Sequence, residues 1–256
     1  MNPYETDKLL AEYLLFHFGS AEEILPTGAG ELVHALDYPV RCVTECVDLG
    51  ALPANARALD LGCAVGRSSF ELARSCESVI GIDFSQRFIS AAQGIARDGE
   101  LRYNRLDEGT LTTSRIARVP EGIETSRVTF EQGDAMDLRP DLGTFDLVLL
   151  ANLIDRLREP RRCLARLSAL VKPGGQLVIT SPYTWLEEFT PRAHWLGGFV
   201  DAGGERVTTR DGLQIALREA FEFVGTKDLP FLIREHARKF QWSLAEATMW
   251  RRRASE

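Results

Sequence analysis

From residue 56 onward, short apolar runs alternate with segments whose apolar residues recur at helical spacing. The apolar runs fall at residues 58–61, 79–82, 128–132, 145–151 and 176–181, and the helical segments at 68–75, 86–96 and 160–170. Strands that alternate with helices predict an α/β fold, in which helices cover both faces of a parallel sheet. Two later runs, at 221–233 and 242–252, alternate apolar and polar residues and predict an antiparallel end to that sheet.

Two helical segments precede the first of these strands. Apolar residues recur at helical spacing over residues 5–18, where Gly19 ends the run, and a second helix is predicted over residues 40–49. We therefore expect residues 1–50 to form an N-terminal helical cap and residues 51–256 to form the main domain.

Two longer segments do not fit the alternation. Residues 100–127 exceed an ordinary helix–strand connection and alternate in part, which predicts an inserted hairpin or flap. This insertion could cover a pocket, meet a partner or be a solvated decoration. Residues 182–206 form a predicted loop that is rich in aromatic residues and glycine.

The composition and charge of the chain indicate which classes of partner it is expected to bind. It has 256 residues, of which 45% are hydrophobic and 26% charged, and its formal net charge is −7. An acidic chain whose arginines are scattered disfavours a nucleic-acid partner. The N-terminus lacks the pattern of a signal peptide and no long apolar run occurs, so we expect a cytoplasmic protein with no membrane contact.

The five cysteines predict neither a metal site nor a disulfide framework. Cys42 and Cys46 are four residues apart, but no second Cys/His pair lies at a spacing that would complete a zinc site. We therefore expect buried, reduced thiols and no bound metal.

The segment "DLGCAVG", residues 60–66, joins the first predicted strand of the sheet to a helix. Small residues let the backbone approach a ligand closely. A dinucleotide fingerprint would need a third glycine where this chain has Arg67, which argues against a nicotinamide-dependent oxidoreductase. With Asp60 before the glycines, the turn suits a ligand that presents an ammonium group and no pyrophosphate, such as S-adenosylmethionine.

Acidic residues also end the next two strands. Asp83 in "GIDFS" can accept hydrogen bonds from both ribose hydroxyls, and Asp134 in "QGDAMDL" can accept one from the adenine amino group. Open α/β sheets bind their ligands at these carboxyl ends of the strands.

The segments "DLGCAVG", "GIDFS", "GDA" and "VKPGG" resemble, in this order, those of class I S-adenosylmethionine-dependent methyltransferases, over residues 55–182. The resemblance implies a Rossmann-like, mostly parallel seven-stranded sheet with an antiparallel last strand. It implies S-adenosylmethionine as cofactor and S-adenosylhomocysteine as product. The residues that it assigns to the cofactor are Asp60, Gly62, Cys63, Ala64, Gly66, Asp83, Phe84, Gly133, Asp134, Ala135, Ala151 and Asn152.

A narrower resemblance runs over nearly the whole chain. The segments "YETDKLLAEYLLFHFG", "YPVRCVTECVDLG", "ANLIDRLREPRRCL", "SPYTWLEEFTP" and "IREHARKFQWSLAEATMW" are similar to the C-terminal methyltransferase domain of ovothiol synthases. This implies methyl transfer to the π nitrogen of 5-thiohistidine in ovothiol biosynthesis, with sulfur inserted beforehand by a separate sulfoxide synthase and lyase. The alternative is another small amine, acid or thiol as acceptor.

The resemblance places Asn152 and Asp155, in "LLANLIDRL", beside the reacting methyl group. Asp155 or the Tyr183 phenol could act as a base, or an anionic acceptor could need none. For the acceptor we expect Arg41 to bind its carboxylate, and we also place Tyr4 at the acceptor site, where it could close over the cofactor. Rings that could contact the acceptor are those of Tyr183, Trp185 and Phe84. A non-catalytic module that only binds the cofactor is the remaining alternative class.

Overall fold

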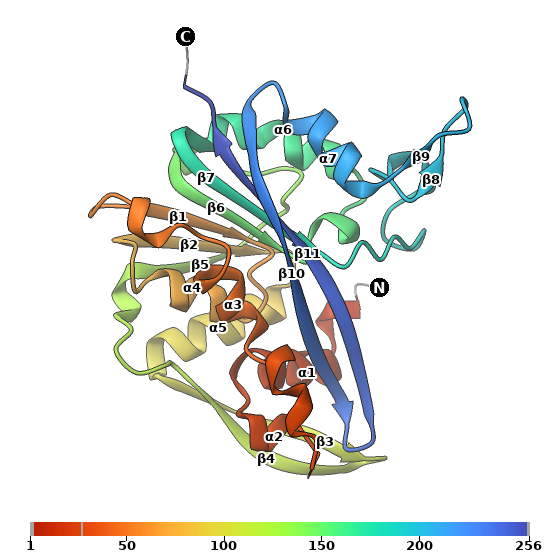
Figure 1. Cartoon of the computed structure of the whole chain (residues 1–256). Coiled ribbons are helices and arrows are strands. Elements are labelled where there is room, and N and C mark those ends of the chain that lie inside the picture. Colours follow the sequence, from red (N-terminus) through yellow and green to blue (C-terminus); the bar gives the residue numbers. More distant parts are fainter. Residues whose placement is uncertain (1–2, 27, 255–256) are drawn as a thin grey trace.

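The computed structural model describes residues 3–26 and 28–254, and its centre is a seven-stranded sheet (Figure 1). The strand order is β10-β11-β7-β6-β1-β2-β5. Pairing is parallel from β7 through β6, β1 and β2 to β5, whereas β11 runs antiparallel to β7. The bounds are Arg57–Leu61 (β1), Ser78–Asp83 (β2), Val128–Gln132 (β5), Phe145–Ala151 (β6), Val171–Ser181 (β7), Phe221–His236 (β10) and Lys239–Arg252 (β11). The predicted mostly parallel sheet with an antiparallel end is therefore confirmed.

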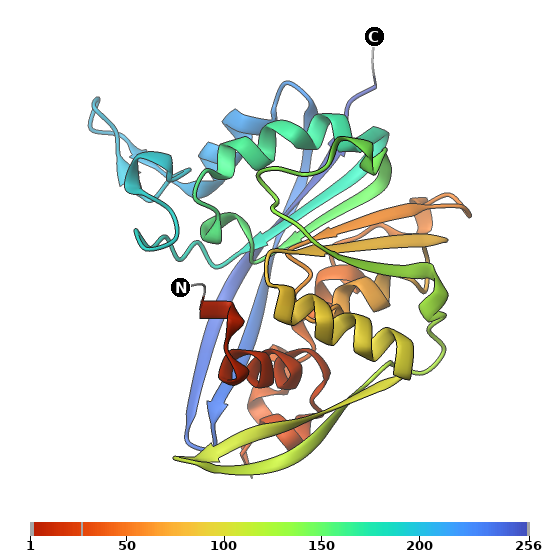
Figure 2. The same ribbon diagram turned by 180° about the vertical axis from the view of Figure 1, so that it is seen from behind.

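Helices cover both faces of this sheet, as Figure 2 shows from behind. Four of them are Arg67–Leu72 (α4), Gln86–Asp98 (α5), Pro160–Leu170 (α6) and Thr209–Leu217 (α7). Helices α6 and α7 lie on one side, where Leu164, Leu167 and Leu213 are buried. Helices α4 and α5 lie on the other side, where Phe70 and Phe88 are buried. Each face of the sheet thus has its own hydrophobic core.

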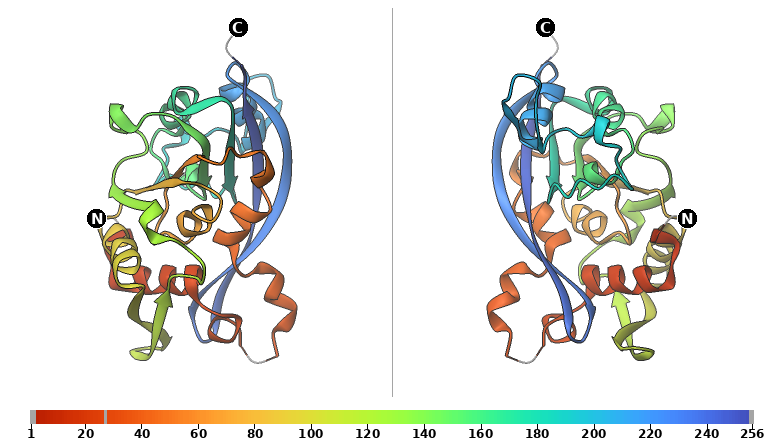
Figure 3. Two further views of the ribbon diagram at one scale, coloured as in Figure 1. Left: turned by 90° about the vertical axis from the view of Figure 1, so that its left-hand side faces the viewer. Right: turned by 90° about the vertical axis from the view of Figure 1, so that its right-hand side faces the viewer.

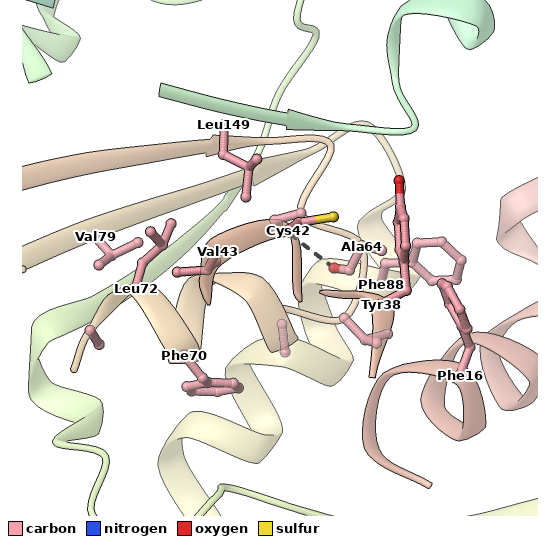
Figure 4. Packing of buried hydrophobic residues seen from close by; sticks show 14 of the residues in the cluster. Phe16, Tyr38, Cys42, Val43, Ala64, Phe70, Leu72, Val79, Phe88 and Leu149 are labelled. Atoms are coloured by element: carbon pink, nitrogen blue, oxygen red, sulfur yellow. Dashed lines mark hydrogen bonds between the residues drawn. The ribbon is translucent and has the colours of Figure 1, made fainter. Parts of the chain in front are cut away.

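The N-terminal region packs against the face of the sheet that α4 and α5 cover. Its elements are Pro3–Glu5 (η1), Asp7–Phe18 (α1), Ala21–Ile24 (α2), Gly30–Ala35 (η2), Tyr38–Thr44 (α3) and Leu49–Ala51 (η3). The second predicted helix begins earlier and ends earlier than expected, because Pro39 occupies its first turn and Glu45 is its C-cap. Tyr38 and Cys42 share one hydrophobic core with Phe70 of α4 (Figure 4). The cap is therefore continuous with the core of the main domain.

The insertion after α5 forms the predicted hairpin, from Glu100–Glu108 (β3) and Leu111–Arg118 (β4). It lies beside α1 and the far end of β10, and Figure 3 shows the β10–β11 hairpin running from the sheet to this region. Arg234 of β10 donates to the carbonyls of Glu23 and Ile24 and to the Asp107 carboxylate. These contacts tie the cap to both hairpins.

The long loop after β7 contains short elements rather than a regular layer. They are Arg192–His194 (η7), Phe199–Val200 (β8) and Arg206–Val207 (β9); the remaining short helices are Thr125–Arg127 (η4), Pro140–Leu142 (η5) and Ile154–Arg156 (η6). Over residues 3–26 and 28–254, no helix is both long enough and apolar enough to cross a bilayer.

Candidate active site

A cavity of about 490 Å³ lies where β1, β2, β5 and β6 end. All the residues assigned to the cofactor from the sequence line it, with the exception of Gly66. This is the edge at which open α/β sheets bind ligands. The cavity volume is typical of a small-molecule site.

The turn after β1 holds its open shape through positive backbone angles. Gly62, Ala64 and Gly66 have φ values of 75°, 49° and 89°. A Cβ atom at Gly62 would lie 3.0 Å from the Leu153 side chain, and one at Gly66 would lie 2.5 Å from the ring of Phe130. Gly62 therefore keeps the floor of the cavity open, whereas Gly66 permits packing behind the turn.

Asp83, at the end of β2, fixes this turn. Its Oδ2 accepts a hydrogen bond from the Ala64 N–H at 2.9 Å, and its Oδ1 accepts one from the Ser85 N–H at 2.8 Å. Burial raises the pKa of Asp83 to about 6, against the effect of the Ser85 and Ala64 N–H groups. The carboxylate oxygens keep further lone pairs for a ligand that donates hydrogen bonds.

Asp60 lies at the base of the cavity and is 1% exposed. The Ser69 hydroxyl donates to its Oδ2 at 2.6 Å, while no group among the described residues hydrogen-bonds to its Oδ1. Burial raises the pKa of Asp60 to about 7. A buried carboxylate oxygen with no donor favours a ligand that brings a cation.

Asp134 and Phe84 also line the cavity; Asp134 follows the edge strand β5 and Phe84 follows its neighbour β2. The Met136 N–H donates to Oδ1 of Asp134 at 2.8 Å. Phe84 is 60% exposed, which is unusual for a phenylalanine and leaves its ring available to a flat ligand.

The N-terminal cap supplies an aromatic wall that the sequence analysis did not assign. Tyr13 and Phe16 of α1 line the cavity together with the predicted Tyr4 and with Phe189 of the long loop. Ring centroids are 6.1 Å apart for Tyr4 and Tyr13, and 6.4 Å apart for Tyr4 and Phe189. The helical spacing of apolar residues over 5–18 predicts that one face of this helix is buried. It does not indicate that this face packs over the ligand cavity.

His17 and Arg156 are two further lining residues that the sequence analysis missed. Burial lowers the pKa of His17 to about 3, so the imidazole is neutral at physiological pH. The Arg156 guanidinium lies 5.0 Å from the ring centroid of Phe189 and donates to Asp155 and to the Thr184 carbonyl.

Asn152 follows β6 and lines the cavity, as predicted. Its backbone has a φ of 52°, and its N–H donates to the Thr180 carbonyl at 2.9 Å. The Tyr38 hydroxyl donates to Oδ1 of Asn152 at 2.7 Å. Tyr38 also lines the cavity and was not expected there.

Four of the residues that the sequence predicts to contact the methyl acceptor do not line this cavity. Two of them, Asp155 and Tyr183, are the predicted candidates for a general base. Asp155 is fully buried, and its Oδ2 accepts from Arg156 and from the Thr184 N–H. The Tyr183 hydroxyl donates to Oε2 of Glu246 at 2.6 Å. Both groups are therefore engaged with other groups of the protein.

The other two residues are Arg41 and Trp185. The Arg41 guanidinium donates to the Glu45 carboxylate and to the carbonyls of His34 and Pro230. The Trp185 indole donates to the Thr209 hydroxyl and stacks on Trp195. The structure does not bring Arg41 or Trp185 to the site at which they were expected to hold the acceptor, because other groups of the protein satisfy their side-chain N–H donors.

The sequence of the chain is similar to those of known methyltransferases. A family model described as "Methyltransferase domain" matches residues 52–201. The chain is 28% identical over 154 residues to the ubiquinone biosynthesis O-methyltransferase of Xanthomonas axonopodis pv. citri, covering 60% of this chain and 53% of that protein. It is 29% identical over 150 residues to norajmaline N-methyltransferase of Rauvolfia serpentina, covering 57% and 42%. The chain thus spans about half the length of these curated relatives.

Solved structures share the fold. An S-adenosylmethionine-dependent methyltransferase of Methanosarcina mazei superposes with a TM-score of 0.53 at 20% identity, covering 80% of this chain and 96% of that one. The N-methyltransferase NodS of Bradyrhizobium japonicum WM9, in complex with S-adenosylhomocysteine, superposes with a TM-score of 0.51 at 15% identity, covering 95% and 98%.

Proposed function

The chain belongs to the methyltransferase-domain family, and from that premise we propose that it transfers the methyl group of S-adenosylmethionine to a nitrogen of a small molecule. The observation that carries the proposal is the meeting of Asp60, Asp83 and Asp134 in one cavity at the ends of neighbouring strands. Three carboxylates at this edge suit the three polar parts of this cofactor.

The residues present fit the cofactor. The undonated Oδ1 of Asp60 suits the ammonium group, Asp83 suits the ribose hydroxyls, and Asp134 suits the adenine amino group. The exposed ring of Phe84 suits stacking on the adenine. When bound, S-adenosylmethionine supplies a methyl carbon on a positively charged sulfur, which reacts with a lone pair in an in-line displacement.

The acceptor is a small molecule in this account. A cavity of about 490 Å³ that must also hold the cofactor has a size typical of small-molecule sites. The aromatic wall of Tyr4, Tyr13 and Phe189 suits such a ring. This argument favours a small acceptor over a polymer.

We propose 5-thiohistidine as this acceptor and its π nitrogen as the methylated atom. The support is the resemblance of the chain to the methyltransferase domain of ovothiol synthases, and the alternative remains another small amine, acid or thiol. The nitrogen lone pair forms the new C–N bond while the C–S bond breaks, and its electron pair stays on the cofactor sulfur. Because the acceptor sulfur is the softer nucleophile, selectivity for nitrogen must come from orientation within the cavity.

The acceptor needs no general base in this proposal. A thiol-substituted imidazole loses its proton readily, and Tyr183 and Asp155 are held by Glu246 and Arg156. Sulfur insertion is assigned to a separate sulfoxide synthase and lyase that act earlier. We propose a cytoplasmic enzyme with no nucleic-acid or membrane partner.

The experiment is a methylation assay with three acceptors. Purified protein is incubated with methyl-labelled S-adenosylmethionine and 5-thiohistidine, histidine or histamine, and products are located by mass spectrometry and NMR. We expect a label on the π nitrogen of 5-thiohistidine. Turnover of histidine or histamine without turnover of 5-thiohistidine would support the alternative acceptor. Failure of the protein to bind S-adenosylhomocysteine in a calorimetric titration would contradict the proposal as a whole.

A further inference from the structure

We propose that Tyr38 is a positioning residue that fixes the Asn152 side chain with its NH2 group toward the acceptor. The site then selects acceptors that present a lone pair or negative charge at that point. This inference rests on the proposed function, since it concerns the same cavity, and it deepens that function by defining the acceptor's polarity.

The backbone and side chain of Asn152 are both fixed. Its φ of 52° is stabilised by the hydrogen bond from its N–H to the Thr180 carbonyl on the neighbouring strand β7. Its Oδ1 accepts from the Tyr38 hydroxyl at 2.7 Å. Tyr38 is 2% exposed and packs in the core near Phe16 (Figure 4). Its ring centroid lies 6.0 Å from that of Phe16 and 4.7 Å from that of Phe231, so its own orientation is fixed.

Each hydroxyl group in this network can donate only one hydrogen bond, and this fixes which group is the donor in each pair. The Tyr38 oxygen also lies 2.6 Å from Oγ1 of Thr180, a residue with no exposed surface. Tyr38 has one proton and donates it to Asn152, so the Thr180 hydroxyl donates to Tyr38. The Cys42 thiol, 3.9 Å from Thr180, is then the donor at the far end of the chain.

The opposite set of donors and acceptors would leave one buried hydroxyl proton with only a weak acceptor. If the Asn152 amide were turned, Tyr38 would donate to Thr180, and the Thr180 proton would have only the Cys42 sulfur, which is a weak acceptor. Burial raises the pKa values of both Tyr38 and Cys42 well above neutrality, so neither gives up its proton at physiological pH. The first direction, with Tyr38 as donor to Asn152, leaves both N–H bonds of Asn152 for the cavity.

An amide donor at this position has a chemical consequence for the acceptor. It stabilises an anionic or lone-pair group and disfavours an ammonium group, which has no lone pair to offer. In 5-thiohistidine the group that suits it is the thiolate. A thiolate held by Asn152 is kept from attacking the methyl carbon, which gives the orientation that nitrogen methylation requires.

A double-mutant cycle tests whether Tyr38 acts through Asn152. The variants are Tyr38→Phe, Asn152→Gly and the double variant, with glycine chosen because it tolerates the positive φ of position 152. We expect Tyr38→Phe to lower kcat/KM for 5-thiohistidine by roughly 10–100-fold when Asn152 is present, and by less than about 3-fold in the glycine background. Equal losses in both backgrounds would overturn the inference.

A matched control separates this effect from a general loss of packing. Tyr103→Phe removes the hydroxyl of another buried tyrosine, on β3 and away from the cavity, and should leave kcat/KM unchanged. Tyr38→Phe should also leave the affinity for S-adenosylhomocysteine within about 3-fold of the wild type, whereas a distorted site would weaken both.

A neutron crystal structure of the deuterated protein with S-adenosylhomocysteine tests the network without any acceptor. We expect the Tyr38 deuteron to point to Oδ1 of Asn152 and the two Nδ2 deuterons to point into the cavity. An Asn152 nitrogen at the Tyr38 oxygen would overturn the inference. If instead the deuterons are as expected but 5-thiohistidine is not methylated, the proposed acceptor fails and the positioning role stands.

Discussion

Replacement of Asp60 by Asn should stabilise the cofactor-free protein while weakening its cofactor binding. Asp60 is 1% exposed and its Oδ1 has no hydrogen-bond donor among the described residues, so its charged form is costly in the free protein. Asparagine keeps the size of the side chain and can still accept from the Ser69 hydroxyl. The substitution thus removes a charge that only a cationic ligand group would compensate.

The size of the effect follows from the pKa of Asp60, which burial raises from 3.8 to about 7. A carboxyl group whose pKa is higher in the folded protein than in the unfolded chain stabilises the fold at pH values below the unfolded pKa. This stabilisation is lost as the pH rises from the unfolded pKa through the folded pKa. The loss is complete above pH 7 and amounts to about 4 kcal/mol. The amide NH2 of the variant takes the place of the unpartnered Oδ1. A buried NH2 group without an acceptor lowers the free energy of unfolding by about 1–3 kcal/mol. A net gain of about 1–3 kcal/mol remains at pH 8 and shrinks toward zero at pH 5.

Thermal unfolding between pH 5 and pH 8 measures this gain, and calorimetric titration measures the affinity for S-adenosylhomocysteine. At pH 8 the variant should melt roughly 2–12 °C higher than the wild type, since each kcal/mol is worth about 2–4 °C in a chain of this size. Its affinity should fall by about 10–100-fold with the loss of a charged hydrogen bond. Asp98→Asn, at an exposed acid, is the matched control and should change neither. A variant that melts lower at pH 8, or that binds the ligand as tightly as the wild type, would refute the reasoning.

Three further substitutions test other parts of the structure. Asp83→Ala should weaken S-adenosylhomocysteine binding by about 100-fold or more in a calorimetric titration, because the carboxylate also holds the Ala64 and Ser85 N–H groups; unchanged affinity would contradict its role. Gly62→Ala should lower the free energy of unfolding in urea by about 1–3 kcal/mol, since φ at this position is 75°; a neutral result would mean that the turn relaxes. Arg234→Met should cost about 2 kcal/mol and lower Tm, because it breaks the bonds from β10 to the cap; an unchanged Tm would show that apolar packing alone holds the cap.

The sheet and the cofactor side of the cavity could be predicted from the sequence because both depend on local patterns. Short apolar runs between helical segments specify parallel strands, and the residue that follows each run lies at the sheet edge where ligands bind. Asp60, Asp83 and Asp134 each stand at or within two residues of the end of such a run, and all three line the cavity. The positions of these three residues and of Asn152 could be predicted without knowing any contact between segments distant in sequence.

The acceptor side could not be predicted in the same way, because it is formed by contacts between segments far apart in the chain. Tyr183 follows a strand as Asn152 does, yet its hydroxyl is bound by Glu246, 63 residues away. Arg41 is satisfied in part by the Pro230 carbonyl, 189 residues away. Tyr38 occupies the position beside Asn152 instead, and its only local signal was the apolar face of a short helix.

A crystal structure of the protein with S-adenosylhomocysteine and 5-thiohistidine tests the central claim most directly. The account predicts that the cofactor product contacts Asp60, Asp83 and Asp134, and that the π nitrogen is the ring atom closest to its sulfur. A cofactor product bound away from these carboxylates, or an acceptor whose thiolate is closest to that sulfur, would contradict it.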